Sequence, residues 1–243
     1  MQKLKFLSGN TLKLIAAIAM VVDHIGVIFF PQIRLLRMIG RLSFPIFAFM
    51  IAEGCKHTRN KLRYFLTVAA LALSFQTVYF FALGNLNMCI FVTFSLSILM
   101  IYAMQYLKRT LFDENASLLR MILACLIFFG LIIAAFAINL VVDMDYGFAG
   151  CMVPVFASIF VSTENTPEKI KRWDNNYTQV FALSIGLLAL ALNNTAIQFL
   201  SFLTVPLLLM YSGKRGRLKL KYFFYIFYPA HLVILYGISM LIK

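Results

Sequence analysis

The chain has 243 residues, of which 62% are hydrophobic and only 13% are charged, and its mean hydropathy is +0.88. Soluble domains carry about half apolar and roughly a quarter charged residues, so this composition excludes a soluble globular protein and indicates an integral membrane protein. The formal net charge is +13. Because the basic residues stand in short gaps between apolar runs, this charge indicates contact with the headgroups of a lipid bilayer, and we expect no nucleic-acid partner.

Apolar runs predict membrane helices along the whole chain. A bilayer core of about 30 Å needs roughly 20 apolar residues per helix. The runs occupy about residues 12–30, 38–54, 63–83, 88–107, 118–141, 147–162, 178–193, 196–212 and 222–241. The sixth and seventh runs are short, and Asn193-Asn194 alone separates the seventh from the eighth. We therefore predict one all-α domain over residues 1–243, a polytopic transmembrane helix bundle with about nine spans and a range of eight to ten.

Charges in the gaps between the runs predict the orientation of the chain. Lysine and arginine gather in every second gap, at residues 56–63, 108–120, 169–172 and 214–221. The alternate gaps, at residues 84–87, 142–146 and 193–195, hold asparagine and aspartate without lysine or arginine. Short cytoplasmic loops carry the excess of positive charge. We therefore expect a cytoplasmic N-terminus and an extracytoplasmic C-terminus.

Three arginines depart from this charge pattern. Arg34, Arg37 and Arg41 follow the first run, on the face where basic residues should be rare. Their spacing of i, i+3 and i+7 places them on one stripe of a helix. Three explanations are open: the arginines reach the outer headgroups, the span count is wrong, or the arginines form an anion site. The third rests on the fact that guanidinium groups pair well with carboxylate and phosphate. We favour the anion site.

Asp23 and His24 lie more than halfway along the first run. At a helical rise of 1.5 Å per residue they stand about 9–10 Å short of its outer end. A charge at such depth costs at least about 3 kcal/mol, so ionisable residues there are functional candidates. Consecutive helix positions diverge by about 100°, so the two side chains cannot point at one spot. We expect His24 to face a cavity and Asp23 to pair with Arg37 or Arg41.

Two further sets of polar residues are candidates on the extracytoplasmic half. His231 lies in the middle of the last run, two residues after Pro229, which can kink a helix and open a cavity wall. Asp145 and Tyr146 follow the fifth run and are expected at the outer rim.

At the inner end of the second run, Glu53 stands close in sequence to Lys56, His57 and Arg59. We expect a salt bridge between Glu53 and one of these cations. The basic side chains at this end also suit the phosphates of a cytoplasmic cofactor.

The residue types limit the chemistry. A histidine beside a carboxylate and arginines can take a proton from an amine or hydroxyl, or carry an acyl group, and arginine can stabilise the oxyanion that develops. The same residues suit a proton-coupled transporter equally well. The four cysteines and three histidines form no metal-binding motif, so we expect no metal.

Four blocks of this sequence resemble the TraX family. They are residues 8–26 with Asp23 and His24, residues 37–59 with Arg37, Arg41, Glu53, His57 and Arg59, residues 145–147, and residues 224–232 with His231. The blocks are spread from one end of the chain to the other, in the order and spacing of that family.

The resemblance implies a multi-pass protein of the bacterial inner membrane. The family is associated with N-terminal acetylation of conjugative pilin and is similar to distant membrane acyltransferases. It implies acetyl transfer from cytoplasmic acetyl-CoA to an amine or hydroxyl of a protein N-terminus, a glycan or a lipid. On this reading the predicted residues are His24, Asp23 and Arg41 for catalysis, Arg34, Arg37, Asp145, Tyr146 and His231 for substrate binding, and Glu53, His57 and Arg59 for acetyl-CoA.

Two alternatives remain at this stage. The buried Asp, His and Arg residues also suit a proton-coupled transporter or flippase, and the chain could serve as a non-catalytic membrane assembly factor.

Overall fold

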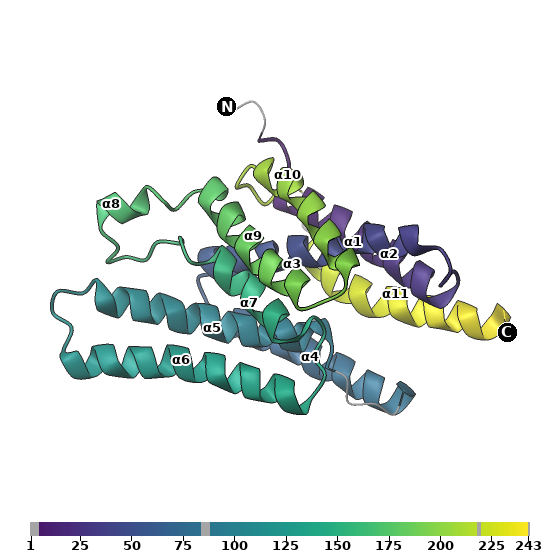
Figure 1. Ribbon diagram of the computed structural model, residues 1–243, viewed down its shortest axis with the longest axis horizontal. Coiled ribbons are helices and arrows are strands. Elements are labelled where there is room, and N and C mark those ends of the chain that lie inside the picture. The colour runs from purple at the N-terminus through teal and green to yellow at the C-terminus, as the bar shows by residue number, and fades with distance from the viewer. Residues whose placement is uncertain (1–4, 84–87, 218–219, 243) are drawn as a thin grey trace. The chain divides into compact units, whose positions relative to one another are not determined.

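The computed structural model describes residues 5–83, 88–217 and 220–242 (Figure 1). Within these ranges the chain is helical, and the only β pairing is two isolated bridges, Leu7 with Tyr211 and Met88 with Met144. The predicted all-α architecture is confirmed. The chain divides into two compact units, Met1–Met50 with Ala191–Lys243 and Ile51–Leu190.

Each of the nine predicted runs contains a helix. In chain order the helices are α1 (Gly9–Ile28), α2 (Arg34–Gly40), α3 (Ser43–His57), α4 (Lys61–Leu83), α5 (Ile90–Leu111), α6 (Leu118–Val141), α7 (Gly147–Ala157), α8 (Glu168–Lys171), α9 (Asn176–Leu192), the 3-10 helix η2 (Ala196–Leu203), α10 (Thr204–Leu209) and α11 (Lys221–Ile242). The second run contains α2 and α3, and the eighth contains η2 and α10.

Four helical segments of the described chain are long and apolar enough to cross a membrane. They are Gly9–Ile28, Arg34–His57, Ile90–Leu111 and Leu118–Val141. Shorter apolar helices include Gly147–Ala157, whose 11 residues extend over about 16 Å at a rise of 1.5 Å per residue. Such a helix is shorter than the hydrocarbon core of a bilayer, as the short sixth run of the sequence indicates.

Helix α6 has an apolar, exposed surface of the kind that contacts lipid. Its most apolar window has a mean hydropathy of 3.0, yet only 11% of that window is buried within the chain. Large side chains such as Leu126, Ile133 and Leu140 are exposed. The buried positions on this helix are Ala124 and Ala135, whose small side chains let neighbouring helices approach. A surface of this kind is stable in hydrocarbon and not in water.

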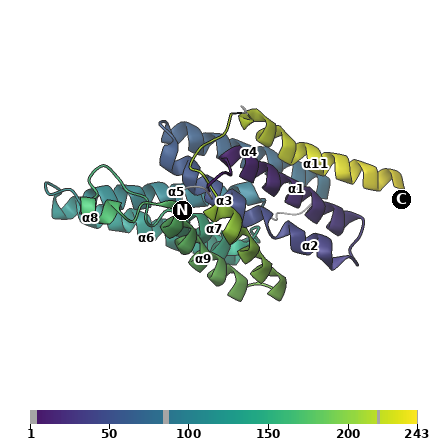
Figure 2. The ribbon, with the colours of Figure 1, turned by 90° about the horizontal axis from the view of Figure 1, so that it is seen from above.

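The first unit is built around α1, against which α2 and α11 pack. Figures 1 and 2 both show α11 running alongside α1. Backbone hydrogen bonds also join the two sequence segments of this unit. The amide of Leu7 donates to the carbonyl of Met210 at 3.1 Å, and the amide of Ser212 donates to the carbonyl of Leu7 at 2.9 Å. The first helix is therefore held to the last third of the sequence.

A break separates α2 from α3 at Arg41 and Leu42. In a continuous helix the amide of residue 45 would donate to the carbonyl of residue 41, but Pro45 has no amide hydrogen. The turn tightens there instead, and the amide of Leu42 donates to the carbonyl of Ile39 at 3.1 Å. The guanidinium of Arg41 is thereby placed just beyond the end of α2.

In the second unit, α4, α6 and α7 each pack against α5. Ser97 on α5 donates its hydroxyl hydrogen to the carbonyl of Cys151 on α7 at 2.7 Å. Lys108 holds the far end of α7, because its ammonium donates to the carbonyls of Ser158 at 3.2 Å, Val161 at 3.1 Å and Ile159. This lysine satisfies carbonyls that the short helix leaves without intrahelical partners.

Candidate functional site

Asp23 on α1 forms an ion pair with Arg37 on α2. Arg37 Nη1 donates to Asp23 Oδ2 at 2.9 Å, and the two side chains keep 36% and 20% of their surface exposed, respectively. The pairing predicted for Asp23 is therefore confirmed, with Arg37 as the partner. The pair neutralises both charges at the contact between the two helices, which lowers the cost of placing them within a membrane protein.

Two glycines allow this contact between α1 and α2. A Cβ atom on Gly40 would lie 2.1 Å from Asp23 Oδ1, and one on Gly26 would lie 2.7 Å from the Cβ of Leu36. Real carbon atoms do not approach so closely, so both positions need a residue without a side chain. The Asp23 carboxylate thus lies directly against the backbone of α2.

His24 on α1 and His231 on α11 form a histidine pair. The Nε2 of His231 lies 3.4 Å from the Nδ1 of His24, and the ring centroids are 5.0 Å apart at an interplanar angle of 68°. Each ring also contacts a carbonyl one turn earlier on its own helix. His24 Nδ1 lies 2.8 Å from the oxygen of Met20, and His231 Nδ1 lies 3.0 Å from the oxygen of Phe227.

These contacts determine where the ring hydrogens lie. A carbonyl oxygen only accepts hydrogen bonds, so Nδ1 is the donor in both rings. In the neutral state the Nε2 of His231 then carries a lone pair and faces the Nδ1–H of His24. The Nε2 of His24 also carries a lone pair, and it makes no hydrogen bond with the described residues.

Aromatic neighbours hold the ring of His231. Its side of α11 carries Phe227, stacked on it at a centroid distance of 5.4 Å and an angle of 14°, and Tyr228, at 5.5 Å and 77°. The residue is only 6% exposed. His231 is thus a fixed and buried ring, whereas His24 is half-buried.

The three arginines that the sequence places on one stripe have separate positions. Arg34 begins α2 and is exposed, and Arg37 pairs with Asp23. Arg41 lies past the end of α2, where its Nη1 donates to Oε1 of Gln198 on η2 at 3.2 Å. The three arginines thus have different surroundings, and Arg41, with right-handed helical φ and ψ of −61° and −15°, directly follows the last residue of α2.

The residues predicted to bind acetyl-CoA lie at the end of α3 in the second unit. Of the three cations expected near Glu53, His57 is the one that lies beside it, with Nε2 3.4 Å from Glu53 Oε2, and the His57 side chain is 63% exposed. Glu53 itself is buried at 8% exposure, and Arg59 is exposed in the following loop. Nearby, Lys56 Nζ donates to Asp174 Oδ1 at 2.6 Å.

Asp145 and Tyr146 occupy the turn that leads into α7, also in the second unit. The amide of Asp145 donates to the carbonyl of Met88 at 3.0 Å, and its own carbonyl accepts from the Thr93 hydroxyl at 2.9 Å. Tyr146 and Gly147 have left-handed φ angles of 63° and 59°. Surrounding chain atoms raise the pKa of the Asp145 carboxyl to about 6 through desolvation, although the residue remains exposed on one side.

Sequence reasoning did not single out Gln198 or Ser201. Both lie on η2, at 2% and 0% exposure, in the first unit with the histidine pair and Arg41. The available signal was their spacing with Thr204, since polar residues at i, i+3 and i+6 within an apolar run share one face of a 3-10 helix.

The chain is similar to a known protein family and to two known proteins. The family model described as TraX protein matches residues 8–239. A probable fimbrial assembly protein of Dichelobacter nodosus, FimC of serogroup H1, is 28% identical to the chain over 97% of each sequence. The protein RP591 of Rickettsia prowazekii (strain Madrid E) is 45% identical over 40 residues, and the match covers 16% of each sequence. No solved structure matches the chain.

Proposed function

The chain belongs to the TraX family, and from that premise we propose that it is a membrane-embedded acyltransferase. The proposed reaction moves an acetyl group from cytoplasmic acetyl-CoA to an amine or hydroxyl acceptor at or across the membrane. The observation that carries this proposal is the histidine pair, in which Nδ1 of each ring is bound to its own helix and Nε2 of His24 keeps a lone pair.

His24 is the general base in this proposal. Its Nε2 takes a proton from the acceptor as the amine or hydroxyl attacks the thioester carbonyl. The tetrahedral intermediate then expels the thiolate of CoA, which recovers the proton from His24 Nε2. The acyl carbon loses one bond to sulfur and gains one to nitrogen or oxygen, and the histidine ends in its starting state.

His231 is a positioning residue for this step. When His24 accepts a proton it becomes a cation, and the Nε2 lone pair of His231 faces its Nδ1–H. That contact keeps the ring orientation, in the way that a carboxylate does for the histidine of a hydrolase triad. Asp23 does not take this role, because its carboxylate is bound to Arg37.

Acetyl-CoA is assigned to the basic end of α3 on the ground of charge. The side chain of His57 is 63% exposed, and Arg59 is exposed in the next loop, so both are accessible to phosphates. Glu53, buried beside His57, keeps that ring in place. Arg34, exposed at the start of α2, together with Asp145 and Tyr146, remains a proposed contact for the acceptor.

A relative supports the acceptor class that we propose. One relative is named as a probable fimbrial assembly protein and matches along nearly the whole chain. We therefore place this protein in pilus or fimbrial assembly, with the terminal amine of a subunit as its acceptor.

The test uses the full chain purified in detergent, with carbonyl-labelled acetyl-CoA and a peptide that has a free N-terminal amine. Acetyl transfer is read as label in the peptide and as released CoA. His24→Gln should lower the rate by about 10²–10⁴-fold, as expected for loss of a general base. His57→Gln is the matched control, because it removes an exposed histidine and should raise the KM for acetyl-CoA while leaving kcat unchanged.

Unchanged transfer in His24→Gln would refute the role of this histidine. If the wild-type chain releases no CoA but moves a solute across liposome membranes in a pH-dependent and His24-dependent manner, the acyltransferase proposal fails and a proton-coupled transporter is established.

A further inference from the structure

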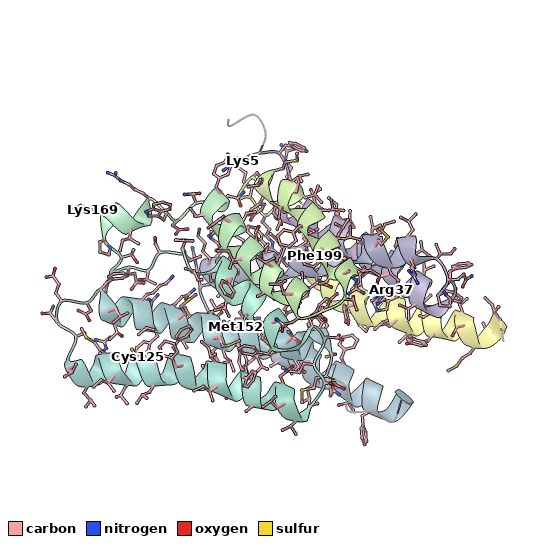
Figure 3. All side chains as sticks on the ribbon, viewed as in Figure 1. Lys5, Arg37, Cys125, Met152, Lys169 and Phe199 are labelled. Atoms are coloured by element: carbon pink, nitrogen blue, oxygen red, sulfur yellow. The ribbon has the colours of Figure 1, made fainter. Side chains whose placement is uncertain are left out.

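A buried polar stripe runs along η2 and into α10. Gln198, Ser201 and Thr204 are 2%, 0% and 0% exposed. A 3-10 helix has three residues per turn, so residues three apart lie one above the other. The opposite side of η2 carries Phe199 and Leu203, which are 45% and 61% exposed; Figure 3 labels Phe199. This short helix therefore presents apolar side chains outward and polar side chains inward, the reverse of a helix in water.

One of the inward side chains, Gln198, contacts Arg41, and buried polar atoms of Arg41, Gln198 and Ser201 have no partner among the described residues. Gln198 Oε1 accepts from Arg41 Nη1 at 3.2 Å. Arg41 Nε, Gln198 Nε2 and Ser201 Oγ are buried and have no hydrogen-bond partner among the described residues. Thr204 differs, because its hydroxyl donates to the carbonyl of Ser201 at 2.6 Å. An unpaired buried donor costs about 1–3 kcal/mol, so a cluster of such donors in one place requires a reason.

The charge of Arg41 also lacks a counter-charge. Within the described ranges Arg41 forms no ion pair, and the carboxylate of Asp23 is bound to Arg37 through Oδ2, while its Oδ1 has no hydrogen-bond partner. Among the described residues, the side chain of Arg41 is hydrogen-bonded to the neutral amide of Gln198. A buried or half-buried cation without an anion is unfavourable, and a bound anion would correct this.

We propose that Arg41, Gln198 and Ser201 form a binding site for a carboxylate group. Every unmatched nitrogen in the cluster can only donate, so the ligand must be an acceptor, and the charge of Arg41 requires it to be negative. The guanidinium uses Nη1 for Gln198 and leaves free the edge that contains Nε. That edge, with Nε–H beside Nη2–H, has the planar fork geometry that holds the two oxygens of a carboxylate.

Gln198 and Ser201 complete the site from η2. The amide nitrogen of Gln198 lies directly beside the oxygen that Arg41 holds, so this bond also orients the free N–H groups. Ser201 adds a hydroxyl one turn further along the same face. The site belongs to substrate recognition rather than to proton transfer, and it does not depend on the proposed acyl transfer. It indicates that a molecule handled by this protein carries a carboxyl group.

Acetate is the probe for the first measurement. The full chain in detergent is heated in sodium acetate, sodium phosphate or sodium chloride at equal ionic strength, and the line width of ¹³C-acetate is recorded in the same samples. We expect acetate to raise the thermal midpoint above that in chloride and to broaden on addition of the protein. Equal midpoints in acetate and chloride would overturn the proposal, and so would stabilisation by phosphate without stabilisation by acetate.

The variant Gln198→Glu tests the carboxylate site most directly. It keeps an oxygen for Arg41 Nη1, removes both amide hydrogens and supplies the missing negative charge within the chain. We expect its thermal midpoint in chloride to exceed that of the wild type, and its affinity for acetate to fall at least about tenfold. An unchanged response to acetate would refute the site.

Ser201→Ala and Thr204→Val form a matched pair on the same stripe. Both remove a buried hydroxyl, but only Ser201 has an unmatched one. Ser201→Ala should weaken acetate binding about threefold to tenfold, whereas Thr204→Val should leave it unchanged. Equal weakening by both variants would mean that general packing, and not a donor to the anion, is responsible. These binding measurements remain decisive even if the protein shows no acetyl transfer.

Discussion

His24 and His231 are 207 residues apart in the sequence, and the Nε2 of one lies 3.4 Å from the Nδ1 of the other. Each ring is held by a carbonyl of its own helix, so the relative orientation of the rings depends on how α1 packs against α11. The pair is therefore a property of the folded unit and not of either helix alone. In this proton arrangement the Nε2 lone pair of His231 faces His24, and the Nε2 lone pair of His24 has no partner among the described residues.

Replacement of His231 should separate positioning from binding. We expect His231→Ala to lower kcat for acetyl transfer about tenfold to hundredfold, because the Nδ1–H of His24 keeps the Met20 carbonyl but loses His231 as its second acceptor when the ring becomes charged. KM should stay the same, since His231 contacts no substrate in the proposed mechanism. His231→Gln should recover part of kcat, as the amide oxygen can accept the same hydrogen. Steady-state kinetics of the three proteins checks this, and a rise in KM with constant kcat would contradict it.

Gly40→Ala should destabilise the first unit. The added Cβ would lie 2.1 Å from Asp23 Oδ1, so the carboxylate must move and its bond to Arg37 is strained. We expect a loss of about 2–4 kcal/mol in the free energy of unfolding, measured by denaturing detergent titration. Gly130→Ala on α6 is the control, because no atom lies within 4 Å of its added Cβ. That control should be neutral or slightly stabilising, by up to about 1 kcal/mol.

The ion pair between Asp23 and Arg37 should appear as coupling in a double-mutant cycle. Asp23→Asn and Arg37→Met each leave one charge without its partner, and the double variant removes both charges. Because the side chains are 20% and 36% exposed, respectively, we expect a coupling of about 1–2 kcal/mol, below the range for fully buried pairs. The unfolding free energies of the four proteins give this value. Strictly additive losses would show that the pair does not contribute.

The raised pKa of the Asp145 carboxyl should make the stability of the protein depend on pH. Its pKa is raised from 3.8 to about 6, so between these values the folded chain binds more protons than the unfolded chain. Stability should therefore fall as pH rises through this window, by a small amount because one side of the residue is exposed. The variant Asp145→Asn cannot ionise at this position. Between pH 4.5 and 7 the thermal midpoint of the wild type should therefore fall by more degrees than that of the variant. Parallel midpoints in the two proteins over this range would refute the shift.

Sequence patterns determined the helices and one of the two central contacts. Apolar runs that lie in lipid satisfy their backbone groups by forming helices, and Asp23 needed a cation close by, which limited its partner to the few nearby arginines. The interruption before Pro45 was also readable in principle, because a proline removes the amide that a continuous helix uses.

The other contacts could not be obtained from local pattern. Periodicity indicates which face of a helix is buried but not which helix covers it, so the meeting of His24 with His231 had no signal in either segment. Gln198 was missed for a different reason. Its stripe has the three-residue period of a 3-10 helix, and the run containing it was read as an ordinary α-helical span.

The first unit is built from two distant segments of the sequence, which has a consequence for its biosynthesis. That unit contains Met1–Met50 and Ala191–Lys243, so its first helix is synthesised long before its last one. At a rate of about 5–20 residues per second, the 207 residues between His24 and His231 take about 10–40 s to appear. During this interval His24 is in the membrane without its partner, while all of Ile51–Leu190 can fold. A nascent or truncated chain therefore carries an incomplete histidine pair, and the proposed catalytic centre forms only when translation is almost finished.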